Sequence, residues 1–500
     1  MNTFVDSLKR TTNFITTENG ALAHKTTLNK VYDLFAFGGA YRRRSKEDQI
    51  LLFKNAFEEN HILGLKCLFY IRDIRGGQGE RDFFRNCFRW LAQEYPDVAR
   101  RNLVNVAEYG RYDDLYCVEG TSIENDMFEL IKNQIRIDID SLKAGNKVSI
   151  SLLGKWLKSE NASSLETKRL ANRTREYLGL THKAYRQLLS SLRTRINIVE
   201  KLMSEGRWEE IEFDKIPSKA GLIYRNAFAR RDVIAARYKE FMASKDTKIN
   251  TGAIYPYEIV KGVTDHFDKY SDYQNLGNIM TQEERNMLNK AWEQQKDYLN
   301  GAPASIMAVV DTSGSMRGLP LNVAISLGMY AAERLGGPFH NHYISFSSSP
   351  NFVEIEGIDF VDKISRIWAT NICENTNLTS VFNLLRECAL DPAIDNNDIP
   401  KKIVVISDME IDNQSTWRGS YTRQTELARI REEWRALGLE MPQLIYWNVD
   451  ARQNVILDNA DDATFVSGCS PVIFESILSG KTGIDLMMDK LNSDRYNAIN

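Results

Sequence analysis

The sequence predicts a two-part protein: an all-α region built from helical repeats, followed by an α/β domain with a doubly wound, mainly parallel sheet. Apolar residues recur at helical spacing from about residue 45 to 300, and strands alternate with helices beyond that point. The chain has 500 residues, of which 43% are apolar and 26% charged, so it is long enough for at least two folded domains.

The first part, residues 1–300, is expected to be helical throughout its core. Segments such as ILLFKNAF, ILGLKCLFYI and FFRNCFRWLA carry apolar residues on one helical face. Turn-forming residues divide the region into lengths typical of stacked helical pairs, and they lie at Arg75–Gly79, Tyr95–Pro96, Gly110, Gly145, Gly179, Gly206 and Pro217. No strict internal repeat is visible, so we expect an irregular, HEAT-like α-solenoid.

The second part, residues 301–500, begins where a buried-strand run, Ile306–Asp311, follows Gly301-Ala302-Pro303. Beyond this run the pattern alternates between helices and strands, as in a parallel sheet covered by helices. The expected helices lie near 319–336, 378–389 and 420–437, and the expected strands are His342–Phe346, Lys402–Ser407, Gln443–Val449 and Thr464–Val466.

The run Asp311-Thr312-Ser313-Gly314-Ser315 places one carboxylate and two hydroxyls at alternate positions directly after the first strand. Oxygen donors with few carboxylates suit Mg²⁺, which keeps open positions for water or for an acidic ligand. Ligands of open α/β sheets bind at the carboxyl ends of the strands, which is where this run lies. Taken alone, the same run is also compatible with a turn before a helix N-cap.

DTSGSM resembles the DxSxS metal-ion-dependent adhesion site of von Willebrand factor A domains. In that family a threonine from a later loop and an aspartate after the central strand complete the site. The resemblance therefore implies one Mg²⁺ or Mn²⁺ ion held by Asp311, Ser313, Ser315, Thr376 and Asp408. Because Glu374-Asn375 replaces the usual Gly-Gly, Thr379 is an alternative to Thr376, and Glu410 is a further acid nearby. One coordination position would remain for an acidic group of a partner protein.

Charge is distributed unevenly along the chain. Residues 1–300 contain 48 Lys+Arg and 41 Asp+Glu, whereas residues 301–500 contain 16 and 26. Residues 151–231 are the most basic stretch, with 17 Lys+Arg against 9 Asp+Glu, interleaved with tyrosine and tryptophan. Such helices could bind phosphates and stack unpaired bases. The alternative is a set of ion-paired surface helices with aromatic residues in the core.

Several segments resemble an uncharacterised Ro-like family related to the TROVE module: residues 70–81, 110–115, 155–157, 185–193 and 216–220. This resemblance implies a ring of helical repeats closed by an A domain, and a ribonucleoprotein component that binds small structured or misfolded RNA. The candidate RNA-binding residues are Arg75, Arg81, Arg111, Lys155, Arg173, Arg175, Lys183, Arg186, Arg193, Arg195, Lys219 and Arg225. The Arg75–Arg81 loop, RGGQGER, could hold a phosphate on its glycine amides or could be a tight helix-to-helix turn.

Other features narrow the class of protein. The N-terminus lacks a signal-peptide pattern, and no apolar run is long enough to span a membrane. Six dispersed cysteines indicate reduced thiols, so we expect a cytoplasmic protein without a disulfide framework. No serine or cysteine nucleophile can be paired with a histidine base. We therefore expect a non-catalytic RNA-binding protein, with a metal-dependent protein-interaction scaffold lacking RNA as the alternative.

Overall fold

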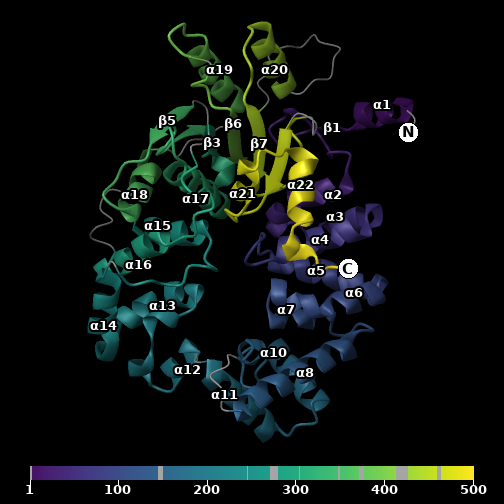
Figure 1. The fold of residues 1–500 in the computed structure, drawn as a ribbon, viewed down its shortest axis with the longest axis vertical. Helices are drawn as coiled ribbons and strands as arrows, with labels where there is room; N and C mark the ends of the chain where they lie inside the picture. Colours follow the sequence, from purple (N-terminus) through teal and green to yellow (C-terminus); the bar gives the residue numbers. More distant parts are fainter. Residues whose placement is uncertain are drawn as a thin grey trace.

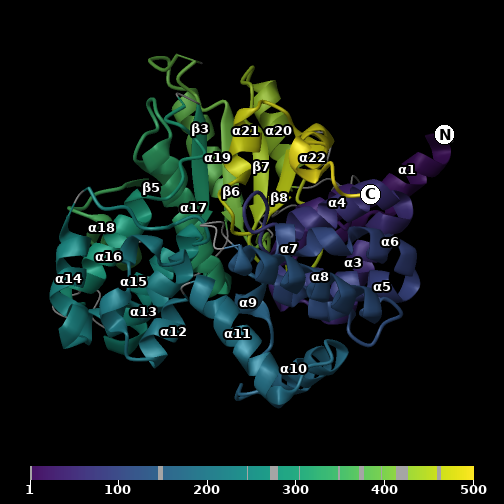
Figure 2. The same cartoon turned by 60° about the horizontal axis from the view of Figure 1, so that its bottom comes forward.

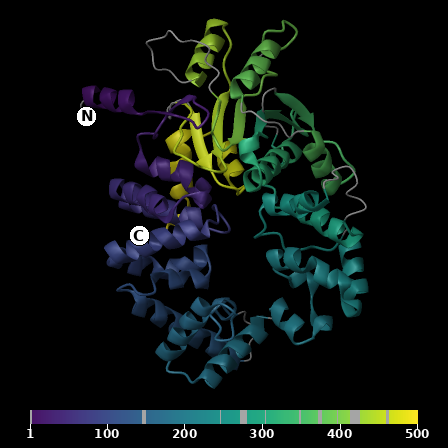
Figure 3. The same cartoon turned by 180° about the vertical axis from the view of Figure 1, so that it is seen from behind.

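A computed structural model describes residues 3–144, 150–196, 198–244, 246–270, 280–302, 305–346, 350–370, 377–395, 397–412, 426–458 and 463–500. The elements follow one another around a closed ring, of which the α/β domain forms one arc and the helices form the rest (Figure 1). The same closed order is visible from behind (Figure 3).

The helical arc begins beside the sheet with α2 (Lys30–Phe37), α3 (Lys46–Glu59), α4 (His61–Arg72), α5 (Arg81–Glu94), α6 (Pro96–Asn102) and α7 (Val106–Tyr109). It continues through α8 (Glu124–Lys143), α9 (Leu153–Trp156), α10 (Leu165–Tyr177), α11 (His182–Ile196) and α12 (Val199–Ser204). It returns to the sheet through α13 (Ser218–Arg230), α14 (Asp232–Ala243), α15 (Pro256–Tyr270) and α16 (Gln282–Glu293). Helices α10 and α11 lie on the side of the ring opposite the sheet (Figure 2).

Local capping explains where several of these helices start. The side chains of Ser45, Asn60, Ser164 and Thr281 each accept a hydrogen bond from the backbone amide three residues on. Such N-caps satisfy amides that a helix leaves unpaired at its first turn. The predicted helical character of this region is confirmed by these elements.

The α/β domain contains a six-stranded sheet with the order β5-β4-β3-β6-β7-β8. Its strands are β3 (Ile306–Asp311), β4 (His342–Phe346), β5 (Asn351–Glu354), β6 (Lys402–Ser407), β7 (Gln443–Asn448) and β8 (Ala463–Ser467). All neighbours pair in parallel except the edge strand β5, which pairs antiparallel with β4. The α-helices that alternate with or follow these strands are α17 (Leu319–Arg334), α18 (Phe360–Thr370), α19 (Leu378–Ala389), α20 (Glu426–Ala436), α21 (Ile473–Leu478) and α22 (Gly483–Leu491). The predicted α/β class with a mainly parallel sheet is confirmed.

An N-terminal hairpin was not predicted. After α1 (Thr3–Thr12), strands β1 (Phe14–Thr16) and β2 (Leu22–His24) pair antiparallel and are joined by a tight turn. His24 and Gly20 also form isolated bridges with Ile456 and Asp412 of the α/β domain. The β1–β2 hairpin therefore lies along the carboxyl edge of the large sheet.

The α/β domain contacts both ends of the helical arc. Helix α2 packs against β8, where the Gly39 amide donates to Ser467 Oγ at 3.0 Å. Helix α15 packs against α17 at the other end. One apolar core runs without interruption from the first helices into the sheet, whereas a second, separate core joins α12, α13, α14 and α16. Among the described residues no helix is long and apolar enough to cross a membrane.

Candidate functional site

The predicted metal-binding run lies at the carboxyl edge of the sheet, where the strand order reverses direction. Asp311 is the last residue of β3, and Asp408 directly follows the neighbouring strand β6. Counted within the domain, the strand order is 3-2-1-4-5-6, and β3 and β6 are the two strands at the switch point. Open α/β sheets bind ligands at such a point because the helices that follow the two strands diverge to opposite faces.

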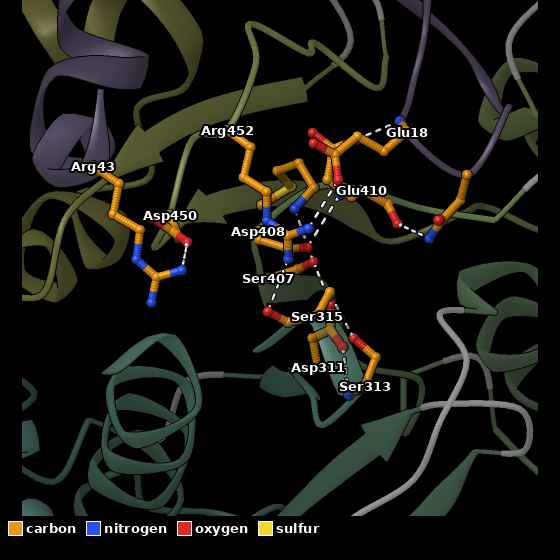
Figure 4. A network of polar contacts seen from close by, with 12 residues as sticks. Glu18, Arg43, Asp311, Ser313, Ser315, Ser407, Asp408, Glu410, Asp450 and Arg452 are labelled. Atoms are coloured by element: carbon orange, nitrogen blue, oxygen red, sulfur yellow. Dashed lines mark hydrogen bonds and ion pairs between the residues drawn. The ribbon is translucent and has the colours of Figure 1, made fainter. Parts of the chain in front are cut away.

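The side chains of this run converge (Figure 4). Asp311 Oδ1 accepts the Ser313 amide at 2.9 Å, and Asp311 Oδ2 accepts the Ser407 hydroxyl at 2.6 Å. The hydroxyl oxygens of Ser313 and Ser315 lie 3.0 Å apart. Two neighbouring ligands of an octahedral Mg²⁺ ion, each about 2.1 Å from the metal, are separated by about 3 Å, so this spacing suits a shared cation.

Asp408 completes this group. Its side chain is fully buried, Oδ1 accepts the Glu410 amide at 3.2 Å, and the Ser315 side chain hydrogen-bonds the carboxylate. Burial raises the pKa of Asp311, and the charge of Asp408 raises it further. Burial likewise raises the pKa of Asp408, although Arg452 opposes this. Two carboxylates buried together in this way favour a bound cation, which would offset their mutual repulsion.

Arg452 is the main contact that sequence reasoning missed. Its Nη2 donates to Asp408 Oδ2 at 2.7 Å and to the Ser315 carbonyl at 2.8 Å, and Nη1 donates to Glu18 Oε2 at 2.8 Å (Figure 4). Arg452 follows β7 and Glu18 lies in the N-terminal turn, so no local pattern links either residue to DTSGSM. The predicted parallel strands do imply, however, that the loop after β7 lies at the same edge of the sheet as Asp311 and Asp408.

The threonine of the predicted site cannot be assigned from the described residues. Thr376 lies outside them, and Thr379 is the second residue of α19, where it is 9% exposed. No group of three or more His, Cys, Asp or Glu suited to a metal occurs in the described ranges. The Asp311 group differs from such a cluster because two of its donors are hydroxyls.

Four of the candidate RNA-binding side chains stabilise the helical packing. Arg173, Arg175 and Arg225 each form an ion pair with a glutamate whose side chain is largely buried. Arg193 donates to the carbonyls of Gly154 and Leu157, both at 2.9 Å. These contacts lie within the helical arc, and that of Arg225 joins α13 to α16, so the four arginines contribute to helix packing whether or not a ligand is present.

Other candidates lie on the surface. Arg75, Arg81 and Lys219 have side chains about half exposed, and each pairs with an acidic neighbour. Lys183, Arg186 and Arg195 are exposed along α11. Three cationic side chains of α11 are therefore exposed to solvent.

A cluster of cations surrounds Trp156. The Arg111 guanidinium lies 4.4 Å and the Lys155 amine 5.5 Å from the Trp156 ring centroid. An open pocket of about 570 Å³ adjoins the tryptophan, and its lining includes Lys155, Ser159, Asn161, Arg186, Arg193 and Lys201. The pocket thus combines one aromatic surface and neutral hydrogen-bonding groups with four cationic side chains and two carboxylates, those of Glu200 and Glu205.

The Arg75–Arg81 loop has the contacts of a tight turn. The amides of Gln78 and Glu80 donate to the carbonyls of Tyr70 and Ile71, at 3.1 and 2.8 Å. The Arg75 amide donates to Asp73 Oδ1 at 3.0 Å. Three of the loop amides, none of them a glycine amide, are therefore used within the protein.

Both parts of the chain match known protein families. Residues 305–497 match a family described as a domain of unknown function, DUF7788, and residues 17–115 and 157–301 match another, DUF2828. The chain is similar to uncharacterized protein L728 of Acanthamoeba polyphaga mimivirus, with 26% identity over 505 residues covering 93% of this chain and 84% of that protein. It is also similar to the crystal structure of the Deinococcus radiodurans RO (RSR) protein, with 13% identity and a TM-score of 0.47, covering 94% of this chain and all of that one.

Proposed function

We propose that this protein binds RNA without catalysing a reaction, through the basic helices opposite the sheet, and that its α/β domain is a von Willebrand factor A-type domain holding one divalent cation. The cations around Trp156 carry the RNA part of the proposal. These cations lie on an array of helical pairs that we interpret as HEAT-like. Their charge is suited to RNA phosphates, so we infer that the protein is a ribonucleoprotein component that recognises structured or misfolded RNA.

Single-stranded RNA fits the chemistry of the Trp156 pocket. An aromatic ring offers a stacking surface for any base, and neighbouring arginine and lysine side chains neutralise phosphates. Asn161 and Ser159 add neutral donors and acceptors beside the ring. A duplex would leave its bases stacked and inaccessible, so unpaired segments should bind more tightly than a duplex of equal length.

RNA affinity and its salt dependence test this proposal. Fluorescence anisotropy with a labelled single strand should show an affinity that falls steeply with salt. Trp156→Ala should weaken binding roughly tenfold, because base stacking on an aromatic side chain is worth about 1–3 kcal/mol. Arg186→Glu should weaken it further and reduce the salt slope, whereas Lys46→Glu, on the distant α3, should change little. Salt-independent binding, or equal affinities for all variants, would contradict the proposal.

The cation part of the proposal is carried by the Asp311, Ser313, Ser315 and Asp408 group. These residues would hold Mg²⁺ or Mn²⁺ through oxygen donors, and the ion would supply a positive charge for an acidic group. The donor set resembles that of adhesion sites more than that of hydrolytic centres, because a nuclease normally requires a second metal or a general base.

A metal-dependent protein scaffold without RNA remains the second candidate function, because the cation group is well formed by itself. A chelator distinguishes the two. RNA bound by the helices should be retained in EDTA, whereas an acidic protein partner bound through the ion should be released. A purified chain that binds no RNA, but binds an acidic protein only with Mn²⁺, would favour the scaffold.

A further inference from the structure

The turn between β1 and β2, residues 17–21, is fastened to the edge of the sheet that carries the cation group. Thr17 Oγ1 donates to the Ile411 carbonyl at 2.7 Å, and Asn19 Nδ2 donates to the Glu410 carbonyl at 2.7 Å. The Glu18 amide donates to Glu410 Oε2 at 2.6 Å. These contacts join segments about four hundred residues apart, and they hold the Glu18 side chain beside the predicted site.

The guanidinium of Arg452 connects Glu18 to this site. It donates to Glu18, to the carboxylate of Asp408 and to the Ser315 carbonyl at the distances given above. Arg452 is 27% exposed, whereas Glu18 is 47% exposed and Asp408 is fully buried. One cation thus bridges a surface carboxylate and a buried carboxylate, which is the role that a divalent ion plays between acidic ligands.

Glu410 provides independent evidence for a ligand at this edge, because one of its buried carboxylate oxygens has no hydrogen-bond partner in the described part of the chain. The residue is 1% exposed, and its Oε2 accepts hydrogen bonds from the Glu18 amide and from Gln453 Nε2. Its second oxygen, Oε1, has no hydrogen-bond partner within the described part of the chain. A buried carboxylate oxygen without a partner is costly, and a cation or its bound water would satisfy it.

We propose that Glu18 is an internal acidic ligand of the cation site and that Arg452 competes with the cation for it. The inference rests on the proposed cation site. Without the ion, Arg452 holds Glu18 and Asp408 together. When the ion binds to Asp311, Ser313, Ser315 and Asp408, it takes the place of the guanidinium, and the carboxylate of Glu18 fills the position that a partner's acidic side chain would otherwise occupy.

In this arrangement the turn of residues 17–21 supplies a ligand from within the same chain and blocks access of external ligands to the cation site. The hydrogen bonds of the turn to Glu410 and Ile411 do not involve the carboxylate of Glu18, so the turn can stay in place while that carboxylate exchanges Arg452 for the ion. An external acidic peptide would then have to displace Glu18. We expect the site of the intact chain to bind free acidic peptides weakly.

Mn²⁺ titration of the full chain, followed by electron paramagnetic resonance, tests this inference. Glu18→Gln should weaken Mn²⁺ binding about tenfold, because a neutral amide replaces a charged ligand. Arg452→Gln should tighten it about tenfold, because the competing charge is removed. The exposed residues Glu94 and Arg101 offer matched controls, and Glu94→Gln and Arg101→Gln should leave the affinity unchanged. Thermal unfolding of each variant checks that the fold is retained.

The outcomes separate failure of this inference from failure of the proposed site. Absence of Mn²⁺ binding in the wild-type chain contradicts the cation site itself. Wild-type binding with the same affinity in Glu18→Gln and Arg452→Gln overturns the internal ligand and leaves the site in place. Hydrogen exchange of residues 14–24 gives a second readout: Mn²⁺ should increase protection in the wild type and not in Glu18→Gln. Decreased protection on adding Mn²⁺ would mean that the ion releases the turn, which contradicts the proposal.

Discussion

Arg72 and Asp114 form a fully buried ion pair that joins two segments of the helical arc. Arg72 Nε and Nη2 donate to Asp114 Oδ2 at 2.9 and 2.7 Å, and the side chains are 1% and 0% exposed. Asp114 also accepts Arg85 Nε at 2.6 Å and the Arg111 amide at 2.9 Å. The segments around residues 70–81 and 110–115 therefore meet in a structural contact.

Removing the charge of Asp114 should destabilise the protein strongly. Asp114→Asn would leave the buried guanidinium of Arg72 without a counter-charge, at a cost of about 3–5 kcal/mol in the free energy of unfolding. Urea denaturation followed by circular dichroism measures this cost. Asp126→Asn, at an exposed pair with Arg100, should cost about 0.5 kcal/mol or less. Equal effects of the two substitutions would show that the buried Asp114 network adds no more to the free energy of unfolding than an exposed ion pair does.

Gly77 should tolerate no side chain, because the loop after α4 folds back on the helix. A Cβ atom at this position would lie 1.9 Å from the Tyr70 carbonyl oxygen and 3.0 Å from Asp73 Cβ. Gly77→Ala should therefore lower the free energy of unfolding by about 1–3 kcal/mol. Gly252→Ala is the control, since its Cβ would meet only Asn250 Oδ1 at 3.7 Å. If Gly77→Ala instead lowered RNA affinity without loss of stability, the loop would be a phosphate-binding element.

The junction between α16 and the α/β domain should weaken in acid. Arg285 Nε and Nη2 donate to Asp359 Oδ2 and Oδ1 at 2.6 and 2.7 Å, and Asn289 Nδ2 donates to Oδ2 at 2.8 Å. Burial acts to raise the pKa of Asp359, but hydrogen bonds from Arg285 and its neighbours outweigh this and lower the pKa below the ordinary value of 3.8. The stabilisation is therefore present above that value and is lost as the pH falls through the lowered pKa.

Asp359→Asn tests this dependence. The variant should be less stable than the wild type by about 1–2 kcal/mol at pH 7, and the difference should shrink as the pH is lowered below 4. Urea unfolding at several pH values measures it, with Asp126→Asn as the exposed control. A difference that grows on acidification would have the wrong sign and would contradict the ion-pair account.

Buried apolar runs made the sheet predictable. All six residues of β3 are buried, as are all but the first of β6 and β7, and such runs read as strands from sequence. Strand β5 was missed because three of its four residues are exposed. The hairpin strands β1 and β2 have three residues each and depend on contacts with the distant α/β domain, so no local pattern marks them.

The candidate site was predictable where it is local. Asp311, Ser313 and Ser315 lie within five residues, and Asp408 follows a recognisable strand. Arg452 and Glu18 lie beside Asp408 only because of the fold. Neither could be predicted, because a sequence shows that a residue is charged but does not show which residue it pairs with. The same limit applies to Arg193 and Arg225, whose charges counted toward a basic surface although their side chains bond inside the protein.

Divalent cations should stabilise the chain through the Asp311 group. An ion that binds only the folded state adds about 2.7 kcal/mol to the free energy of unfolding at a concentration one hundred times its dissociation constant. Thermal unfolding with Mn²⁺ and with EDTA should therefore differ for the wild type. Asp311→Asn should abolish the difference and the double variant Ser313→Ala, Ser315→Ala should reduce it, because each removes oxygen donors. Glu94→Gln should respond as the wild type does. If Asp311→Asn is stabilised by Mn²⁺ as much as the wild type, the ion binds elsewhere, and the geometry of Asp311 and Asp408 would then reflect hydrogen bonding alone.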